Sequence, residues 1–477
     1  MASSGRSSLS ARGGHAQRGK DSRANGSRVN GSTRIPPGQI MPLYKRLPHG
    51  PHRLERGEVV LHQRARIHGA MVEAVAERGY HGTSVKQVIG LAGVSRRSFY
   101  EQFANKQECF FATFDLIVRR DIKQLRKAYL AAHGPIEERA RAVFQTLAQT
   151  TANDRNATVL VVLEAQRSGV EGALRLHKSI GVCEQMLAHS FVEAPGAVAL
   201  PMPVVRAIAG GLHRSIATVL REERTTAGID LAGEMLDWML LFQAPAAEHM
   251  AERMAAGLAT RLREISSAYG HGLSGAESPS RDERTRLLHG ILRLVSREDF
   301  FGLSAPQIAE EANVSIDTFC EMFANKSDCF LAALDMIGDE LLRIAADPEL
   351  VSDDWPQAVR RVLAELMRHL ADHPLHARTL AQDGFFVGSD AVEQIHDLSH
   401  SIATLLTEGA PAQADGSLTT DAIAGAIWHT IRCQVISGRI PLLAALSDHL
   451  AYVVLAPFIG AEAALEAVTD QRRPIGA

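Results

Sequence analysis

Residues 83–106 read TSVKQVIGLAGVSRRSFYEQFANK, and this stretch decides the fold at the front of the chain. Ser84, followed by Gln87 three residues later, is the capping-box signature of a helix start. Gly93 permits the left-handed backbone of a tight turn, and Ser95 can cap the next helix. The stretch therefore predicts two short helices joined by a glycine turn.

Longer helices are expected on both sides of this pair. From Glu58 onward, apolar residues recur at every fourth position with charged residues between them, as in Ile67, Met71 and Val75. Gly79 and Gly82 are expected to end this first helix, and Asn105 with Glu108 opens a long fourth one. Two short helices supported by long ones describe a helix-turn-helix, whose second short helix enters the DNA major groove.

The same residues resemble the TetR family of bacterial one-component regulators. The resemblance rests on a few residue types at fixed spacing over about 54 residues: Thr83-Ser84-Val85, Ala92-Gly93-Val94-Ser95, Phe99-Tyr100, Phe103 and Lys106. It implies an all-α fold in which a small DNA-binding head precedes a larger helical body. In this family the body forms a ligand pocket and a helical dimer interface, so we expect the same of this chain.

The resemblance also implies DNA contacts for eight residues of the head: Thr83, Ser84, Ser95, Arg96, Arg97, Ser98, Tyr100 and Lys106. Thr83 and Ser84 would face a phosphate at a helix start, where the helix dipole favours anions. Residues 95–98 would open the recognition helix. Tyr100 and Lys106 would reach phosphates, which fix register without reading sequence.

Arg96 and Arg97 are the strongest candidates for reading bases. An arginine can pair bidentately with guanine, which contributes roughly 1–3 kcal/mol of discrimination. Adjacent helical residues point about 100° apart, so we expect one arginine to read a base and the other to hold a phosphate. Two ordinary solvated charges are the alternative. The TetR family more often has glycine at the position of Arg97, so this chain departs from the family pattern there.

A second copy of the head follows later in the chain. Residues 282–335 align with residues 62–115 at a constant offset of 220, without a gap. The front copy has seven Lys/Arg and five acids, and the rear copy has five and ten, so the net charges are +2 and −5. Ile316 and Asp317 replace the two arginines, and Cys320 replaces the tyrosine. We expect the rear copy to fold as a helix-turn-helix but to bind DNA poorly or not at all, because like charges repel.

Composition limits what the 477 residues can be. The net charge of −3 hides a basic front, since residues 1–50 hold nine Lys/Arg and one acid. The five cysteines form no Cys-x-x-Cys pair, as expected of reduced thiols in a cytoplasmic protein. No uninterrupted apolar run reaches the roughly 18 residues that span a bilayer, so no membrane is expected. A phosphate-cradling glycine loop and a Gly-x-Ser-x-Gly elbow are both missing, so the sequence does not predict an enzyme.

The domain organisation follows from the repeat and the chain breakers. Tandem TetR-like units are expected, in the following order: a disordered basic tail and connector at 1–57, a head at 58–115, a body at 116–270, a linker at 271–283, a degenerate head at 284–335 and a second body at 336–470. The bodies share a repeat as well, because Ala-Ile-Ala-Gly at 207–210 recurs at 422–425. Two bodies in one chain could pair with each other as a pseudo-dimer, or whole chains could form a homodimer.

The effector of the first body cannot be named from sequence. A small apolar molecule is expected, with Met186, Phe191 and Trp238 as candidate pocket residues, although a plain core explains them equally well. The histidines considered in this body are His177, His189 and His213. They are dispersed without a cysteine or carboxylate at ligand spacing, so neither a metal site nor a cofactor is predicted.

The leading interpretation is a ligand-responsive transcriptional regulator, expected to act as a repressor, that binds a double-stranded DNA operator through its first head. The alternative is a helical sensor or interaction protein with no DNA-binding activity. The two differ in a measurable way, because only the first predicts DNA binding that weakens steeply with salt.

Overall fold

The computed structural model describes residues 56–193, 199–221, 230–242, 258–259, 282–298, 300–350, 354–411 and 419–469. Every regular element in these ranges is a helix, which confirms the all-α fold class. Most of the expected tail and connector (1–57) and of the expected linker (271–283) lies outside the described residues.

The first head consists of four helices at the positions that the caps predict. These are α1 (Arg56–Gly82), α2 (Val85–Ala92), α3 (Arg96–Tyr100) and α4 (Lys106–Ala131). The capping box of Ser84 and Gln87 is present, and Gly93 adopts the left-handed conformation (φ 59°, ψ 41°). Gly79 interrupts the end of α1 with φ 69° and ψ 169°. Local side-chain chemistry therefore sets these helix boundaries.

The first body follows along the chain. Its helices are α5 (Ile136–Asn153), α6 (Arg155–Val159), α7 (Ala165–Arg167), α8 (Val170–Glu193), α9 (Met202–Arg221) and α10 (Leu231–Leu240). A π-helical turn, η1 (Leu160–Glu164), joins α6 to α7. Such turns are uncommon and often lie at functional positions.

The second head repeats the geometry of the first. Its elements are α12 (Glu283–Val295), the 3₁₀ turn η4 (Phe300–Gly302), α13 (Ala305–Glu311), α14 (Ile316–Met322) and α15 (Lys326–Ala345). The capping box recurs at Ser304 and Gln307, and Ser315 caps α14. Asn313 takes the place of Gly93 and has the same left-handed backbone (φ 52°), which asparagine tolerates.

The second body completes the described chain. It contains α16 (Trp355–Asp372), α17 (Pro374–Ala381), η5 (Asp383–Phe386), α18 (Ser389–Thr407), α19 (Thr419–Ile436), η6 (Ile440–Leu446), α20 (Ser447–Ile459) and α21 (Ala461–Thr469). The segment Ile440–Ile459 is apolar enough to cross a membrane, with a mean hydropathy of 1.8, but 78% of it is buried inside the protein. Such burial is typical of a core helix.

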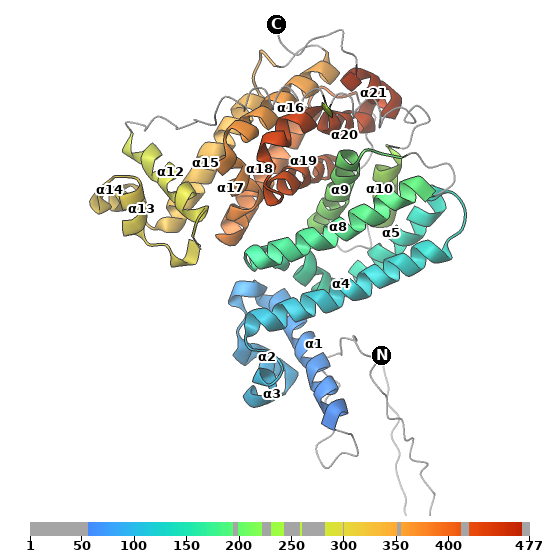
Figure 1. The fold of residues 1–477 in the computed structure, drawn as a ribbon, viewed down its shortest axis with the longest axis vertical. Coiled ribbons are helices and arrows are strands. Elements are labelled where there is room, and N and C mark those ends of the chain that lie inside the picture. The colour runs from blue at the N-terminus through green and yellow to red at the C-terminus, as the bar shows by residue number, and fades with distance from the viewer. Residues whose placement is uncertain are drawn as a thin grey trace, which may run out of the picture.

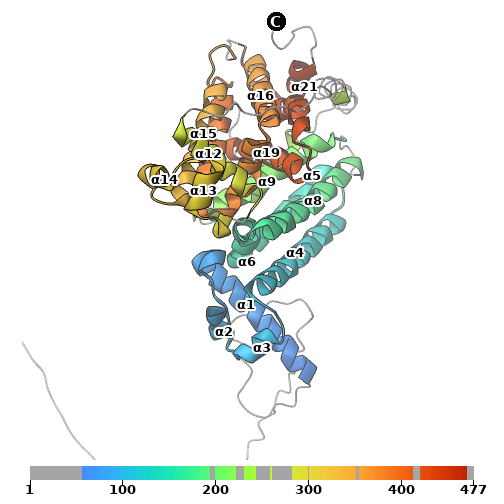
Figure 2. The same cartoon turned by 60° about the vertical axis from the view of Figure 1, so that its left-hand side comes forward.

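Two apolar cores hold the elements together. One fills the first head and reaches α6 and α8, and the other runs from the first body through the second head and second body without a break. Figures 1 and 2 show the first head projecting from one end of the molecule, while the second head lies against the second body. The first head is therefore the more separate part of the structure.

Helices α9 and α19 cross in direct backbone contact, and this crossing joins the two bodies (Figure 1). A Cβ atom built on Gly210 would lie 2.4 Å from Cβ of His429 and 2.6 Å from the carbonyl oxygen of Gly425. A Cβ atom built on Gly425 would lie 2.4 Å from Cβ of Arg214 and 2.6 Å from the carbonyl oxygen of Gly210. The contacts are reciprocal, because Gly425 follows Gly210 by 215 positions and His429 follows Arg214 by the same number.

Candidate nucleic-acid interface and ligand cavity

The recognition helix α3 begins at a well-formed cap. The Ser95 hydroxyl accepts a hydrogen bond from the backbone N–H of Ser98 at 3.0 Å, and the two hydroxyls lie 2.9 Å apart. Phe99 anchors the opposite side of α3 in the head core and is fully buried. The start of α3 is thus fixed against the head, with its first residues facing solvent.

Both predicted base-reading arginines are exposed on this surface. The guanidinium of Arg96 lies over the ring of Tyr100, 5.6 Å from its centroid. The side chain of Arg97 is 88% exposed, and its Nε donates to Glu101 at 2.8 Å. An exposed ion pair of this kind contributes well below about 1 kcal/mol, so a nucleic acid can displace it. Arg96, Arg97 and Tyr100 therefore form one polar, cationic edge that is open to a duplex.

Two residues expected to meet phosphates point into the protein instead. The Thr83 hydroxyl is buried and donates to the carbonyl oxygens of Ala74 at 3.0 Å and Gly79 at 2.8 Å. The Lys106 ammonium donates to the carbonyl oxygen of Tyr80 at 2.9 Å and lies over the ring of that residue. Burial lowers the pKa of Lys106. Both side chains stabilise the end of α1, which differs from the expected phosphate contacts.

The second head explains why this lysine is kept in both copies. Lys326 donates to the carbonyl oxygens of Phe300, Phe301 and Leu303 at 2.9, 3.1 and 2.8 Å. Carbonyl groups at a helix end need donors, and an ammonium group supplies up to three of them. Ser84, in contrast, is exposed at the start of α2 and remains beside the cationic edge.

Sequence reasoning missed Arg66, which holds the turn of the helix-turn-helix. This side chain is buried on α1, and its guanidinium donates to the carbonyl oxygens of Ala92 and, at 2.9 Å, of Gly93. It thereby fixes α2 to α1 at the point where the chain turns toward α3. The available signal was its position one residue from Ile67 on the apolar face of α1.

The corresponding surface of the second head carries no cationic edge. Ile316, Asp317 and Cys320 are all exposed at the start of α14. Glu311 forms an ion pair with Arg293 at 2.7 Å, which neutralises a nearby positive charge. A carboxylate at the place of a guanidinium repels phosphate.

The first head is joined to its body through the backbone of Tyr80. The buried carboxylate of Glu164, in η1, accepts a hydrogen bond from the N–H of Tyr80 at 2.7 Å and pairs with Arg167 at 2.7 Å. The imidazole of His81 lies 2.8 Å from the carbonyl oxygen of Arg167. Since Lys106 binds the carbonyl oxygen of Tyr80, both backbone groups of this residue are bound by charged side chains.

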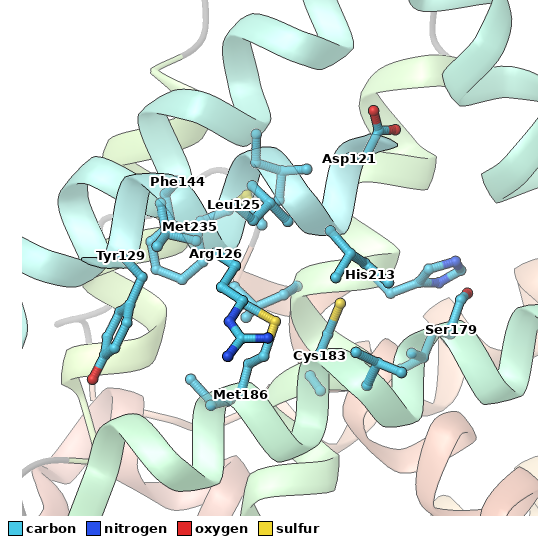
Figure 3. Close-up of a pocket in the computed structure, with 18 of the residues that line it drawn as sticks. Asp121, Leu125, Arg126, Tyr129, Phe144, Ser179, Cys183, Met186, His213 and Met235 are labelled. Atoms are coloured by element: carbon cyan, nitrogen blue, oxygen red, sulfur yellow. The ribbon is translucent and has the colours of Figure 1, made fainter. Parts of the chain in front are cut away.

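A cavity of about 620 Å³ lies within the first body, between α4, α5, α8, α9 and α10 (Figure 3). Its wall is mostly apolar and includes Leu125, Phe144, Met186 and Met235. Met186, a pocket candidate from the sequence, lies in this wall. Phe191 and Trp238 do not line the cavity. Both are buried in the core, and the indole of Trp238 donates to the carbonyl oxygen of Ile208 at 3.3 Å.

Several polar side chains interrupt the apolar wall of the cavity. Cys183 is an exposed free thiol on the cavity wall. Burial, followed by nearby cationic groups, lowers the pKa of His213 to about 3. Asp121 pairs with Arg120 at 2.8 Å. The cavity therefore offers a mostly apolar wall together with the exposed guanidinium of Arg126, which lies among the lining side chains (Figure 3).

Comparison with known proteins identifies the first head. Residues 69–113 match the family described as bacterial regulatory proteins, tetR family. The fatty acid metabolism regulator protein of Bacillus subtilis (strain 168) is 26% identical over 102 residues, which are 21% of this chain and 52% of that protein. The chain thus spans about half the length of this curated relative.

Two solved structures are similar over about a third of the chain. The fatty acid degradation regulator FadR from Bacillus halodurans is 22% identical with a TM-score of 0.34, covering 37% of this chain and 94% of that one. The transcriptional regulator FadR from Bacillus subtilis, in complex with stearoyl-CoA, is 21% identical with a TM-score of 0.33, covering 36% and 96%. Residues 69–113 are a TetR-family N-terminal domain.

Proposed function

We propose that this protein is a ligand-responsive transcriptional regulator that reads DNA with its first head alone. One observation carries the proposal: the exposed edge of Arg96, Arg97 and Tyr100 is matched in the second head by Ile316, Asp317 and Cys320. Guanidinium groups at the start of a recognition helix can read guanine edges and hold phosphates. Ser84 and Ser95, both exposed at helix starts, add donors for the DNA backbone.

The effector we propose is a molecule with a long apolar chain, of the fatty acyl class. The cavity is within the size range of ligand pockets, and its wall is dominated by aliphatic, aromatic and methionine side chains. The exposed Arg126 of the lining suits a carboxylate or phosphate group on the polar end of such a molecule. The name of the curated relative, a fatty acid metabolism regulator, agrees with this class.

We expect the ligand signal to reach the head through η1. Val161 and Val162 of this π turn line the cavity, and Glu164 of the same turn binds the backbone of Tyr80. A ligand that displaces the turn moves this carboxylate, and with it the end of α1. The coupling needs a ligand that binds the two arrangements with different affinity. In the repressor mode that we propose, the ligand-free arrangement binds the operator and the ligand releases it.

The pairing we propose is an intrachain pseudo-dimer of two TetR-like units. An interface with a twofold axis is self-complementary, so equivalent residues make reciprocal contacts. The crossing of Gly210 and Gly425 has this property. Equivalent positions of the two heads also meet, since His81 and Phe301 are 220 positions apart and their ring centroids lie 5.3 Å apart. A single chain then presents one reading head and occupies one half-site.

Selection of bound sequences from random double-stranded DNA tests this function directly. The intact chain should enrich one short site of about half a palindrome, and its binding should weaken steeply with salt. Addition of a long-chain acyl compound should lower the affinity for the selected site. Failure to enrich any sequence, with binding independent of salt, would favour the helical sensor without DNA-binding activity.

A further inference from the structure

A cluster of ionisable side chains lies between the two bodies, away from the head and outside the cavity. Glu184 comes from α8 of the first body, whereas His429 and Cys433 come from α19 of the second. All three are at least nine-tenths buried. Nε2 of His429 lies 2.6 Å from Oε1 of Glu184 and 3.5 Å from Sγ of Cys433. One ligand atom from each residue falls within 4.8 Å of the other two.

His177 adds a fourth group to the cluster. It lies on α8, two helical turns before Glu184, and its ring centroid is 6.2 Å from that of His429. Its Nδ1 atom is buried without a hydrogen-bond partner, and such an atom is costly unless something satisfies it.

The spacing of the atoms suits a tetrahedral ion. With usual zinc bond lengths, tetrahedral coordination separates a sulfur from a nitrogen ligand by roughly 3.6 Å and an oxygen from a nitrogen ligand by roughly 3.3 Å. The distance of 3.5 Å between Sγ of Cys433 and Nε2 of His429 is close to the first value. The carboxylate of Glu184 must withdraw from His429 by roughly 0.7 Å to reach the second. A carboxylate on a long side chain can make this adjustment by rotation.

The chemistry of the cluster also suits a cation at its centre. The carboxylate of Glu184 and the thiol of Cys433 both lie beside the imidazole of His429. Metal ligands bind in their deprotonated forms, so metal binding would release the protons of the cluster into solvent.

We propose that Cys433, His429, Glu184 and His177 form a binding site for a divalent transition-metal ion of the zinc class, which ties α8 of the first body to α19 of the second. The mixed sulfur, nitrogen and oxygen set suits zinc, and four protein ligands are typical of structural sites. Two anionic ligands balance the charge of a dication. Arg206 lies 3.5 Å from the second oxygen of Glu184 and orients that carboxylate.

This site goes beyond the proposed regulatory function, because it fixes the position of the two bodies whatever ligand fills the cavity. Its effect would nevertheless reach the cavity wall. Cys183 and Met186 of α8 lie beside Glu184 in sequence, and both line the cavity. An ion that anchors α8 to α19 would therefore stiffen this wall.

Cobalt(II) titration of the full chain, in a phosphine reductant and after chelator treatment, tests the proposal. A thiolate ligand gives cobalt(II) an intense sulfur-to-metal charge-transfer absorption in the near ultraviolet, together with the visible bands of tetrahedral geometry. We expect both at one equivalent of cobalt and their loss when zinc is added. The histidine cluster of the second body, Glu340, His369 and His376, contains no sulfur, so it cannot produce the charge-transfer band.

Variants assign the band to this site. Cys433→Ser should abolish the charge-transfer absorption, and the matched control Cys320→Ser, on the exposed surface of the second head, should leave it unchanged. His177→Asn keeps the thiolate and should weaken cobalt affinity at least about tenfold. Absence of a thiolate band in the unmodified chain would overturn the proposal, even if Cys433→Ser failed to fold. Persistence of the band in folded Cys433→Ser, or unchanged affinity in His177→Asn, would overturn it in the form given. DNA binding is not part of the readout, so failure of the metal site and failure of the regulatory function are distinguishable.

Discussion

Replacing Gly210 with alanine probes the contact between the two bodies most sharply. The new Cβ would lie 2.4 Å from Cβ of His429, whereas ordinary contact begins at 3.4 Å, so α9 and α19 must separate by about 1 Å. A separation of that size removes a quarter to a half of the attractive dispersion energy of each atom pair along the crossing. Added to the usual cost of overpacking, the expected loss is about 3 kcal/mol of unfolding free energy.

A matched control separates this loss from helix propensity. Gly181 also lies within a helix, but no atom lies within 4 Å of its Cβ position. Gly181→Ala should therefore stabilise the protein by up to about 1 kcal/mol, as alanine favours a helix over glycine. The assay is urea unfolding followed by circular dichroism, with the slope of the transition compared among variants.

The reciprocal position gives a further check on the same crossing. Gly425→Ala should cost about as much as Gly210→Ala, since its Cβ meets Arg214 and Gly210 at the same distances. The double variant should cost less than the sum, because one separation of the helices relieves both clashes. If Gly210→Ala were as stable as Gly181→Ala, the direct backbone crossing, and the intrachain pseudo-dimer built on it, would be wrong.

Three further predictions concern the head, the junction and the cavity. Glu164→Ala should lower the free energy of unfolding by about 2–3 kcal/mol, because a buried charge-assisted hydrogen bond to Tyr80 is lost. The same substitution should uncouple effector binding from DNA affinity, and an unchanged effector response in a gel shift would contradict this route. His68 has its pKa lowered to about 4, mainly by burial and then by Arg64 and Arg119, so the unfolded chain binds the proton more tightly and stability falls as the pH drops below about 6.5. Between roughly pH 8 and pH 5 this loss should be about 2 kcal/mol by thermal unfolding, and His68→Asn should remove that part of the slope. Leu147→Trp should fill the cavity and lower acyl-ligand affinity in calorimetry while leaving operator affinity intact; undiminished ligand binding would place the ligand elsewhere.

The elements that the sequence predicted best are those that local chemistry sets. Ser84 with Gln87, Ser95 and Asn105 each cap a helix where expected, since a cap depends only on residues within one turn. Asn313 in place of Gly93 likewise keeps its backbone conformation. The repeated Ala-Ile-Ala-Gly motif indicates that the bodies share a fold, and the structure places both copies at the α9 and α19 crossing.

Side-chain direction could not be predicted in the same way. Lys106 and Thr83 bear the polar groups expected of phosphate contacts, but each reaches a carbonyl group at the end of α1, and the packing of α1 on α4 decides this. Phe191 and Trp238 have the composition of a pocket wall, yet both pack in the core. Composition alone does not distinguish a cavity wall from a filled interior.

Contacts between segments that are far apart in the chain were the hardest features to predict from the sequence. Glu164 binds a backbone group 84 positions away, and nothing in its local sequence marks it. His177 showed no cysteine or carboxylate at ligand spacing, because its neighbours Glu184, His429 and Cys433 come together only when the two bodies pair. Glu184 and His429 are 245 positions apart, so no local sequence motif can indicate the cluster.

The most direct test of one-headed DNA reading is operator affinity measured by fluorescence anisotropy over a range of salt, for a front-head and a rear-head variant side by side. Arg96→Ala with Arg97→Ala should weaken binding by about tenfold to a hundredfold or more and flatten the salt dependence by about one unit of slope, whereas Asp317→Ala should change neither. Equal affinities for the unmodified chain and the double arginine variant, or a marked change in Asp317→Ala, would contradict the assignment of DNA reading to the first head.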